Sequence, residues 1–176
     1  MTGRDAASSG GYPRVHLVDR MSETKKVVEL VIDLHKNQKV TLADISILYP
    51  YRHRQYSPYR YYIEMWIDDA LRQKQIKHSL VTFSEENPTF YDYTLRRGVT
   101  LSTMDSIKGL DFSAVIVCGL FGFNNPHDKA TDKILLNMKK VYTAMTRAMR
   151  CLDILIPDDR RDVISQFIFN IQNHRS

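Results

Sequence analysis

The sequence predicts an α/β domain with a mostly parallel sheet that helices cover on both faces. Two short and almost uninterrupted apolar runs, Ile45–Tyr49 and Ala114–Gly119, have the length of strands that are buried on both sides. Such runs alternate with segments in which apolar residues recur at helical spacing, which is the order expected of strand-helix-strand units. At 176 residues, 43% of them hydrophobic, the chain is long enough for about one domain with a substantial core.

The first part of the chain contains two such units. Residues 14–18 alternate between apolar and polar side chains like a strand, and Ser22 then offers an N-cap to the first helix. The run Ile45–Tyr49 is the second strand, and a loop that contains Pro50 and Pro58 leads from it to the second helix. The apolar positions that mark the two helices are Val27, Leu30, Val31 and Leu34, then Ile63, Trp66, Ile67, Ala70 and Leu71.

The later elements repeat this order. SLVTF near Leu80 and VTLS at residues 99–102 are predicted strands, and Ala114–Gly119 is the third buried run. We expect a long helix from about Ile134 to Arg150, then the strand CLDILI and a closing amphipathic helix over residues 163–171. In the long helix, Val141, Met145, Ala148 and Met149 are expected to face the core, and Thr143, Arg147 and Arg150 to lie elsewhere.

Composition and charge limit the class of protein. The 25 Lys and Arg residues against 20 Asp and Glu residues give a formal net charge of +5, which favours polyanionic partners. Only two cysteines occur, Cys118 and Cys151, both in apolar runs, so a reducing compartment is expected. Because neither a membrane span nor a signal peptide is evident, we expect a soluble, cytoplasmic protein without a membrane partner. Residues 1–11 look like a disordered lead or a cloning remnant, and residues 12–176 like one domain.

Several self-sufficient active sites are excluded by the sequence. No glycine is followed by lysine, so the chain lacks the G-K-[ST] phosphate loop, and it has no Asp-Glu pair of the kind that helicase ATPases use. The six histidines and two cysteines show no metal-ligand spacing, and no G-x-S-x-G motif occurs. The chain by itself is therefore not expected to hydrolyse ATP or to hold a metal.

Two segments carry candidate chemistry. In VTLSTMDSIKGLDFSAVIVCGL, a strand ends in hydroxyl and acidic residues, and this carboxyl end of a strand is where open α/β sheets bind ligands. The alternative is a plain connector in which Lys108 is merely solvated. In KKVYTAMTRAMRCLDILI, Arg147 has the planar and permanently charged group that can neutralise a γ-phosphate. The alternative there is a surface or ion-paired arginine.

Together these segments resemble a known family. TMDSIKGLDFSAVIV and the later VYTAMTRAM resemble motifs V and VI of the UvrD/Rep/PcrA-like superfamily 1 helicases, typically T-x-H-S-x-K-G-L-E-F and V-A-x-T-R-A. ISILYPYR looks like the strand of motif IVa, and the resemblance spans roughly residues 14–157. It implies a RecA-like (P-loop NTPase-like) three-layer α/β/α domain, which would be the C-terminal, second RecA-like lobe of an ATP-driven DNA translocase.

The resemblance also implies a nucleotide site. Arg147 matches the motif VI arginine that contacts the γ-phosphate of an ATP held mainly by the other lobe, and it is the candidate catalytic residue. Gly109 and Asp111 match the motif V positions that approach the nucleotide, and Lys108 belongs to the same loop. Asp111 stands where the family usually has a glutamate that contacts the ribose. The implied cofactor of the intact enzyme is ATP with Mg²⁺, and none is expected in the isolated lobe.

A DNA contact is implied by the same motif. Thr103 matches a residue that holds a DNA phosphate, and Ser106 lies in the same loop, while Asp105 stands where the family usually has a histidine. Tyr142 matches a frequent aromatic residue just before motif VI. The alternative for Tyr142 is packing beside Met138 and Met145.

The segment YPYRHRQYSPYRYY at residues 49–62 interleaves tyrosines with arginines. Aromatic rings can stack on bases while arginines follow the phosphates, so Arg52 and Arg54 are candidate DNA contacts. The alternative is that the tyrosines pack the following helix against the sheet and the arginines are solvated.

These observations favour one function and leave a second open. The first is the C-terminal motor lobe of a superfamily 1 DNA helicase, whose partners are the N-terminal RecA-like lobe and single-stranded DNA. The second is a free-standing, non-enzymatic module that binds nucleic acid or protein with a helicase-lobe fold. A receiver-like or flavodoxin-like domain shares the architecture but does not account for both motifs. Two family features are missing from the sequence: motif IV, which brings a second γ-phosphate arginine, and the large helical insertion that commonly precedes motif V.

Overall fold

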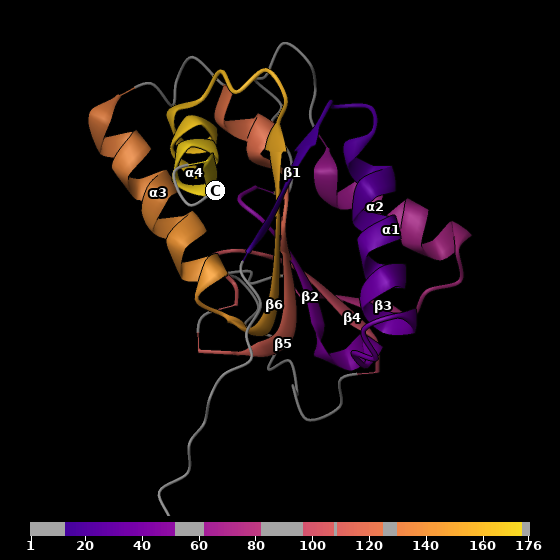
Figure 1. Cartoon of the computed structure of the whole chain (residues 1–176). Coiled ribbons are helices and arrows are strands. Elements are labelled where there is room, and N and C mark those ends of the chain that lie inside the picture. The colour runs from indigo at the N-terminus through magenta and orange to yellow at the C-terminus, as the bar shows by residue number, and fades with distance from the viewer. Residues whose placement is uncertain (1–12, 52–61, 82–96, 108, 125–129, 174–176) are drawn as a thin grey trace, which may run out of the picture.

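Six parallel strands form the centre of the molecule (Figure 1). The computed structural model describes residues 13–51, 62–81, 97–107, 109–124 and 130–173. The strands lie in the order β1-β6-β5-β2-β4-β3, and each neighbouring pair is parallel, which confirms the α/β prediction. Their bounds are β1 Arg14–Val18, β2 Ile45–Tyr49, β3 His78–Val81, β4 Val99–Thr103, β5 Phe112–Val117 and β6 Ala148–Pro157.

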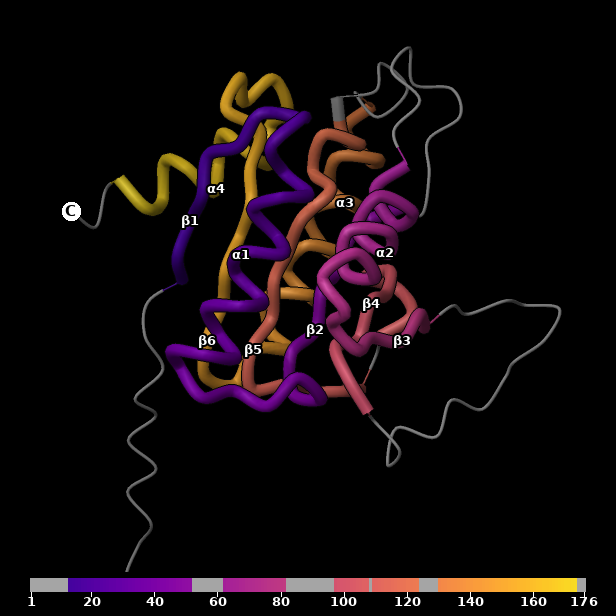
Figure 2. The backbone as a smooth tube through the Cα atoms, turned by 90° about the vertical axis from the view of Figure 1, so that its right-hand side faces the viewer, coloured from indigo at the N-terminus to yellow at the C-terminus, as the bar shows by residue number. Residues whose placement is uncertain are grey.

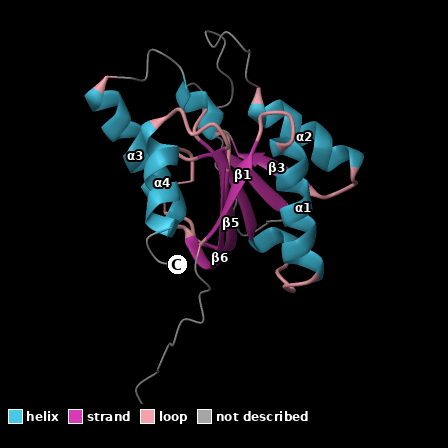
Figure 3. Cartoon of the chain, turned by 45° about the horizontal axis from the view of Figure 1, so that its top comes forward, coloured by secondary structure: helices cyan, strands magenta, loops and turns pink. Residues whose placement is uncertain are grey.

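Helices cover both faces of this sheet (Figures 1 and 3). On one face lie α1 (Glu23–Lys36) and α2 (Ile63–Gln73), and on the other lie α3 (Thr131–Met145) and α4 (Val163–Asn173). Two short 3-10 helices, η1 (Leu42–Asp44) and η3 (Leu120–Asn124), complete the described elements. Since β1 and β3 have a neighbour on one side only, they are the two edges of the sheet (Figure 2).

The strand side chains alternate between two cores. Ile47 of β2 points to the core under α1 and α2, and its neighbour Leu48 points to the core under α3 and α4. Both are fully buried, as expected of a strand with a covered sheet face on either side. The helices contribute the apolar stripes that the sequence predicts, such as Val27 and Val31 of α1.

The boundary between α3 and β6 differs from the prediction. We expected the helix to run to Arg150, but it ends at Met145, and β6 begins at Ala148. Arg147 lies in the turn between them, and its carbonyl accepts a hydrogen bond from the Phe112 amide at 2.9 Å. Pairing with β5 therefore overrides local helical preference, because a sheet hydrogen bond is available at this point. The prediction that Ala148 and Met149 lie on the core face of a helix is wrong, and Met149 is exposed.

The start of α1 is also held differently from the prediction. Ser22 does precede the helix, but its hydroxyl makes no capping hydrogen bond to the helix backbone. Instead, the Asp19 carboxylate accepts hydrogen bonds from the amides of Met21 and Ser22 at 2.8 and 3.0 Å, and from the Ser22 hydroxyl. The hydrogen bonds, first of all that from the Ser22 side chain, lower the pKa of Asp19.

The two cysteines are free thiols in different environments. Cys118 is buried just after β5, where burial first and the nearby Glu23 carboxylate second raise the pKa of its thiol well above the ordinary value. Cys151 is half-buried on β6, and its thiol donates to the Gln38 side-chain oxygen at 3.3 Å. In the described residues there is no helix with the length and apolar character of a membrane span. The expected lead at residues 1–11 lies outside the described residues.

Candidate functional site

Two segments that are distant in sequence meet where β5 and β6 begin. Asp111 directly precedes β5, and Arg147 directly precedes β6. The Arg147 Nη1 atom lies 3.1 Å from the Asp111 Oδ1 atom, and the backbone bond between Phe112 and Arg147 joins the same two segments. The structure therefore brings together the arginine and the carboxylate that the sequence analysis assigned to one nucleotide site.

The end of α3 positions Arg147. Its amide donates to the Ala144 carbonyl at 3.2 Å, and its Nε atom donates to the Thr143 carbonyl at 3.4 Å. Carbonyl groups at a helix end have no partner within the helix and carry partial negative charge, so they attract a cation. The guanidinium is thus held from one side, while 24% of the Arg147 side chain and 54% of the Asp111 side chain stay exposed. Both groups remain accessible to a ligand.

The loop before Asp111 depends on Gly109. This glycine has a φ of +82°, in the left-handed region where side chains other than glycine are strained. A Cβ atom at this position would have no atom within 4 Å, so the glycine serves the backbone turn and leaves open space above it. Lys108, the other predicted member of this loop, lies outside the described residues.

Thr103, Asp105 and Ser106 lie at the opposite end of the sheet. Thr103 is the last residue of β4 and pairs with Tyr49, the last residue of β2. The hydroxyl oxygens of Thr103 and Ser106 are 2.7 Å apart, and the Ser106 amide also donates to the Thr103 carbonyl. Because the next strand is parallel, the chain must return from the carboxyl end of β4 to the amino end of β5. The carboxyl end of a strand, where the sequence analysis expected a ligand to bind, therefore carries Thr103, whereas Asp111 lies at the amino end of β5.

Three residues that the sequence analysis did not single out support this loop. Lys140 of α3 places its Nζ atom 2.7 Å from the Asp105 Oδ2 atom and 5.0 Å from the centre of the Tyr51 ring. The Tyr51 hydroxyl donates to the Asn137 Oδ1 atom at 2.7 Å. One signal was available in the sequence: Asn137 stands at helical spacing from buried Val141, and a polar residue in a core stripe needs a partner.

The tyrosine-rich segment divides into described and undescribed parts. Tyr49 is buried and its hydroxyl donates to Glu64, and Tyr62 makes an edge-on contact with Trp66. These contacts favour the packing alternative for the described tyrosines of the segment. Arg52 and Arg54, the predicted DNA contacts, lie outside the described residues. Tyr142 is 69% exposed, so its ring lies at the surface and is not part of the core.

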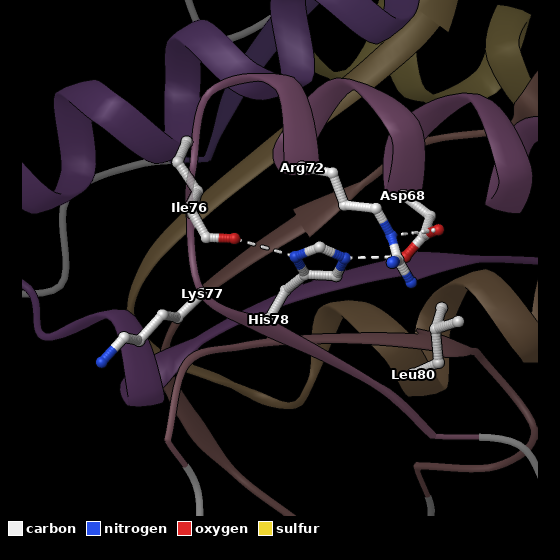
Figure 4. A pocket seen from close by; sticks show the side chains of 6 residues that line it. All are labelled: Asp68, Arg72, Ile76, Lys77, His78 and Leu80. Atoms are coloured by element: carbon white, nitrogen blue, oxygen red, sulfur yellow. Dashed lines mark hydrogen bonds and ion pairs between the residues drawn. The ribbon is translucent and has the colours of Figure 1, made fainter.

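A separate pocket of about 340 Å³ lies beside the edge strand β3 (Figure 4). The His78 ring nitrogens lie 2.7 Å from an Asp68 oxygen and 2.8 Å from the Ile76 carbonyl, while Arg72 Nε donates to the other Asp68 oxygen at 2.9 Å. Lys77 extends away from these groups in Figure 4. The polar side chains therefore join α2 to β3, and they do not converge on a ligand. The described residues contain no group of three or more His, Cys, Asp or Glu that could hold a metal ion.

A known structure with a similar fold is a helicase domain. The C-terminal domain of a possible DNA helicase from Lactobacillus plantarum WCFS1 superposes with a TM-score of 0.53 at 18% identity, covering 85% of this chain and 76% of that one. The Hef helicase domain of Pyrococcus furiosus gives a TM-score of 0.48 at 14% identity, covering 85% of this chain and 28% of that one. No family model and no curated protein matches the sequence. The chain thus has the α/β, RecA-like fold of a helicase C-terminal domain, and the fold prediction is confirmed.

Proposed function

We propose that this chain is the C-terminal motor lobe of a cytoplasmic, ATP-dependent superfamily 1 DNA helicase of the UvrD/Rep/PcrA type. The observation that carries the proposal is the contact between Arg147 and Asp111, whose side chains meet where β5 and β6 begin. Motifs V and VI reach this point from different parts of the sequence. A fold of the helicase C-terminal type agrees with this assignment.

In this proposal Arg147 supplies the charge that catalysis needs. A γ-phosphate accumulates negative charge on its oxygens during transfer, and a planar guanidinium can stabilise that charge with two parallel hydrogen bonds. The ion pair with Asp111 leaves both side chains partly exposed, and exposed pairs contribute only about 0.2–1 kcal/mol. Arg147 can therefore exchange the carboxylate for a phosphate at little cost, and Asp111 is then free to accept a hydrogen bond from a ribose hydroxyl.

The residues present fit one side of an ATP site. The chain offers one arginine, one carboxylate and the open turn at Gly109, which Lys108 precedes in the sequence, but it lacks a phosphate loop with its lysine. ATP with Mg²⁺ would supply the phosphoryl group to be transferred, and the other RecA-like lobe would hold most of it. This lobe alone is therefore expected to hydrolyse nothing.

The opposite end of the sheet would contact DNA. Hydroxyl groups and backbone amides are frequent donors to DNA phosphates, and Thr103 and Ser106 present two neighbouring hydroxyls at the end of β4. Asp105 belongs to the same loop, and Arg52 and Arg54 would extend the track after β2. Opening and closing of the two lobes around ATP would then move this track along single-stranded DNA.

The test is the ATPase activity of the intact helicase, that is, this lobe together with the lobe that bears the phosphate loop. We expect Arg147→Ala to lower the turnover number by about 10³-fold, as with other arginine fingers. Arg150→Ala is the matched control, because Arg150 is exposed, lies three residues further along and is expected to leave turnover unchanged. An unchanged turnover number in a folded Arg147→Ala protein would refute the assignment and favour the non-enzymatic binding module.

A further inference from the structure

An ion pair occupies the surface next to the proposed DNA contact. The Asp105 carboxylate lies 2.7 Å from the Lys140 ammonium and is adjacent in sequence to Ser106, whose hydroxyl pairs with that of Thr103. We propose that Asp105 holds the place of a nucleic-acid phosphate on Lys140, and that single-stranded nucleic acid displaces the carboxylate when it binds. This inference rests on the DNA contact proposed for Thr103 and Ser106.

The two partners of the ion pair are held very differently. Only 16% of the Lys140 side chain is exposed, and its ammonium lies over the Tyr51 ring, where a cation is attracted by the face of the ring. Tyr51 is held in turn by its hydrogen bond to Asn137, which lies one helical turn before Lys140 in α3. The Tyr51 ring also makes an edge-on contact with Phe123, with ring centres 5.9 Å apart. The cation therefore stays in place whether or not the carboxylate is present.

The carboxylate, in contrast, can leave. Asp105 is on the loop after β4 and 52% of its side chain is exposed. Among the residues that the structure describes, Lys140 is the one side chain to which Asp105 is bonded. Rotation of Asp105 into water would break one ion pair whose carboxylate is already half exposed, and the Tyr51 ring would still face the ammonium. The mobile partner of the pair is thus the anion.

The direction of Lys140 agrees with a ligand at the end of β4. Helix side chains tilt toward the N-terminus of their helix. Because α3 ends where β6 begins, its N-terminus lies toward the carboxyl ends of the strands, as Figure 1 shows. A phosphodiester and a carboxylate each carry one negative charge, so the exchange on Lys140 would conserve charge. The site would then combine one ammonium with the two hydroxyls of Thr103 and Ser106.

The first arm of the test removes the competing anion. Binding of a fluorescein-labelled oligothymidylate to the full chain is measured by fluorescence anisotropy over a range of salt concentrations. We expect Asp105→Asn to bind about two- to fivefold more tightly than the wild type, because the oligonucleotide then no longer has to displace a half-exposed carboxylate from Lys140. Asp132→Asn is the matched control, because it removes one exposed acid from the first turn of α3, and it should leave the affinity unchanged.

The second arm removes the cation. We expect Lys140→Met to weaken binding and to reduce the slope of log affinity against log salt by about one unit, as for the loss of one phosphate contact. Lys139→Met, at the exposed neighbouring position of α3, should keep the slope. In the Lys140→Met background, Asp105→Asn should give no further gain, because a double-mutant cycle reports a direct interaction between the two residues.

Three results would overturn the inference. They are an unchanged affinity of Asp105→Asn, the same gain from Asp105→Asn with and without Lys140, and no binding of the oligonucleotide by the wild-type chain at low salt. Thermal melting checks that each variant is folded. If Lys140→Met is unstable, Asp105→Asn still decides the question, since it alters only an exposed loop. None of these results bears on Arg147, so this inference and the proposed ATPase role fail separately.

Discussion

A buried carboxylate fastens the edge strand β1 to its neighbour β6. The Asp153 side chain is completely buried, and its two oxygens accept hydrogen bonds from Arg14 Nη2 at 2.8 Å and from a ring nitrogen of His16 at 2.7 Å. Arg14 also lies 3.5 Å from Asp33 of α1. We expect His16→Phe, which keeps an aromatic ring but has no donor, to weaken this attachment of β1.

The loss of folding stability in each variant depends on which group is left without a partner. His16→Phe leaves one oxygen of a buried carboxylate without its donor, and the loss of a hydrogen bond to a charged group costs about 1.5–3 kcal/mol. Asp153→Leu removes the buried charge itself, and Arg14 and His16, with 42% and 19% of their side chains exposed, can then be solvated. We therefore expect a cost of about 1 kcal/mol or less for Asp153→Leu.

Urea unfolding of the full chain measures both variants. For a domain of this size, the loss in His16→Phe corresponds to a decrease in Tm of about 3–12 °C. The reasoning predicts that removing the carboxylate costs less than removing its donor. It would be refuted if Asp153→Leu lost as much stability as His16→Phe, or more.

Three further predictions concern other charges and one turn. Burial raises the pKa of Asp162, so this carboxyl group stabilises the fold at low pH, and that stability is lost as pH rises through the raised pKa. Asp162→Asn should remove this pH-dependent loss, which urea unfolding measures at a series of acidic pH values. Burial opposes ionisation of Asp68, but hydrogen bonds, first of all that from His78, lower its pKa. The ionised carboxylate therefore stabilises the fold above the ordinary carboxyl pKa, and this stability is lost as pH falls through the lowered pKa. His78→Ala should reduce this loss of stability in acid, measured by the same urea titrations. Gly119 has a φ of +79°, and an added Cβ would lie 3.0 Å from the Tyr49 Cβ atom, so Gly119→Ala should cost at least about 1–2 kcal/mol by the same assay, and an unchanged midpoint would contradict this.

The sequence was sufficient for the fold because its strands and helices have different periods. Ile45–Tyr49 is apolar at every position except Ser46, which marks a strand with two covered faces. Val27 and Val31, one helical turn apart, mark a helix with one buried face. The end of α3 could not be predicted in the same way. Residues 146–150 continue a helical pattern locally, and only the pairing of Ala148 with Phe112, far away in sequence, makes them a turn and a strand.

The motifs single out the candidate residues, but they do not show how these residues lie relative to one another. The motifs identify Thr103, Asp111 and Arg147, but they do not show that the loop crosses from one end of the sheet to the other. The contact of Asp105 with Lys140 depends on how α3 packs, and a lysine on a helix has no local signal that distinguishes a partner from solvent. The relative positions of these residues therefore depend on long-range packing, which the local sequence pattern does not show.

The central claim is the proposal that Arg147 acts on the γ-phosphate, and nucleotide binding by this lobe joined to a lobe that bears the phosphate loop tests it most directly. The affinities for ADP and for a non-hydrolysable ATP analogue are compared in the wild type, Arg147→Ala and the control Arg150→Ala. The account predicts that Arg147→Ala lowers the affinity for the ATP analogue by about tenfold or more, which is the value of a charge-assisted hydrogen bond, and leaves the affinity for ADP unchanged. An equal loss of affinity for both nucleotides, or no loss of affinity for either, would contradict the account.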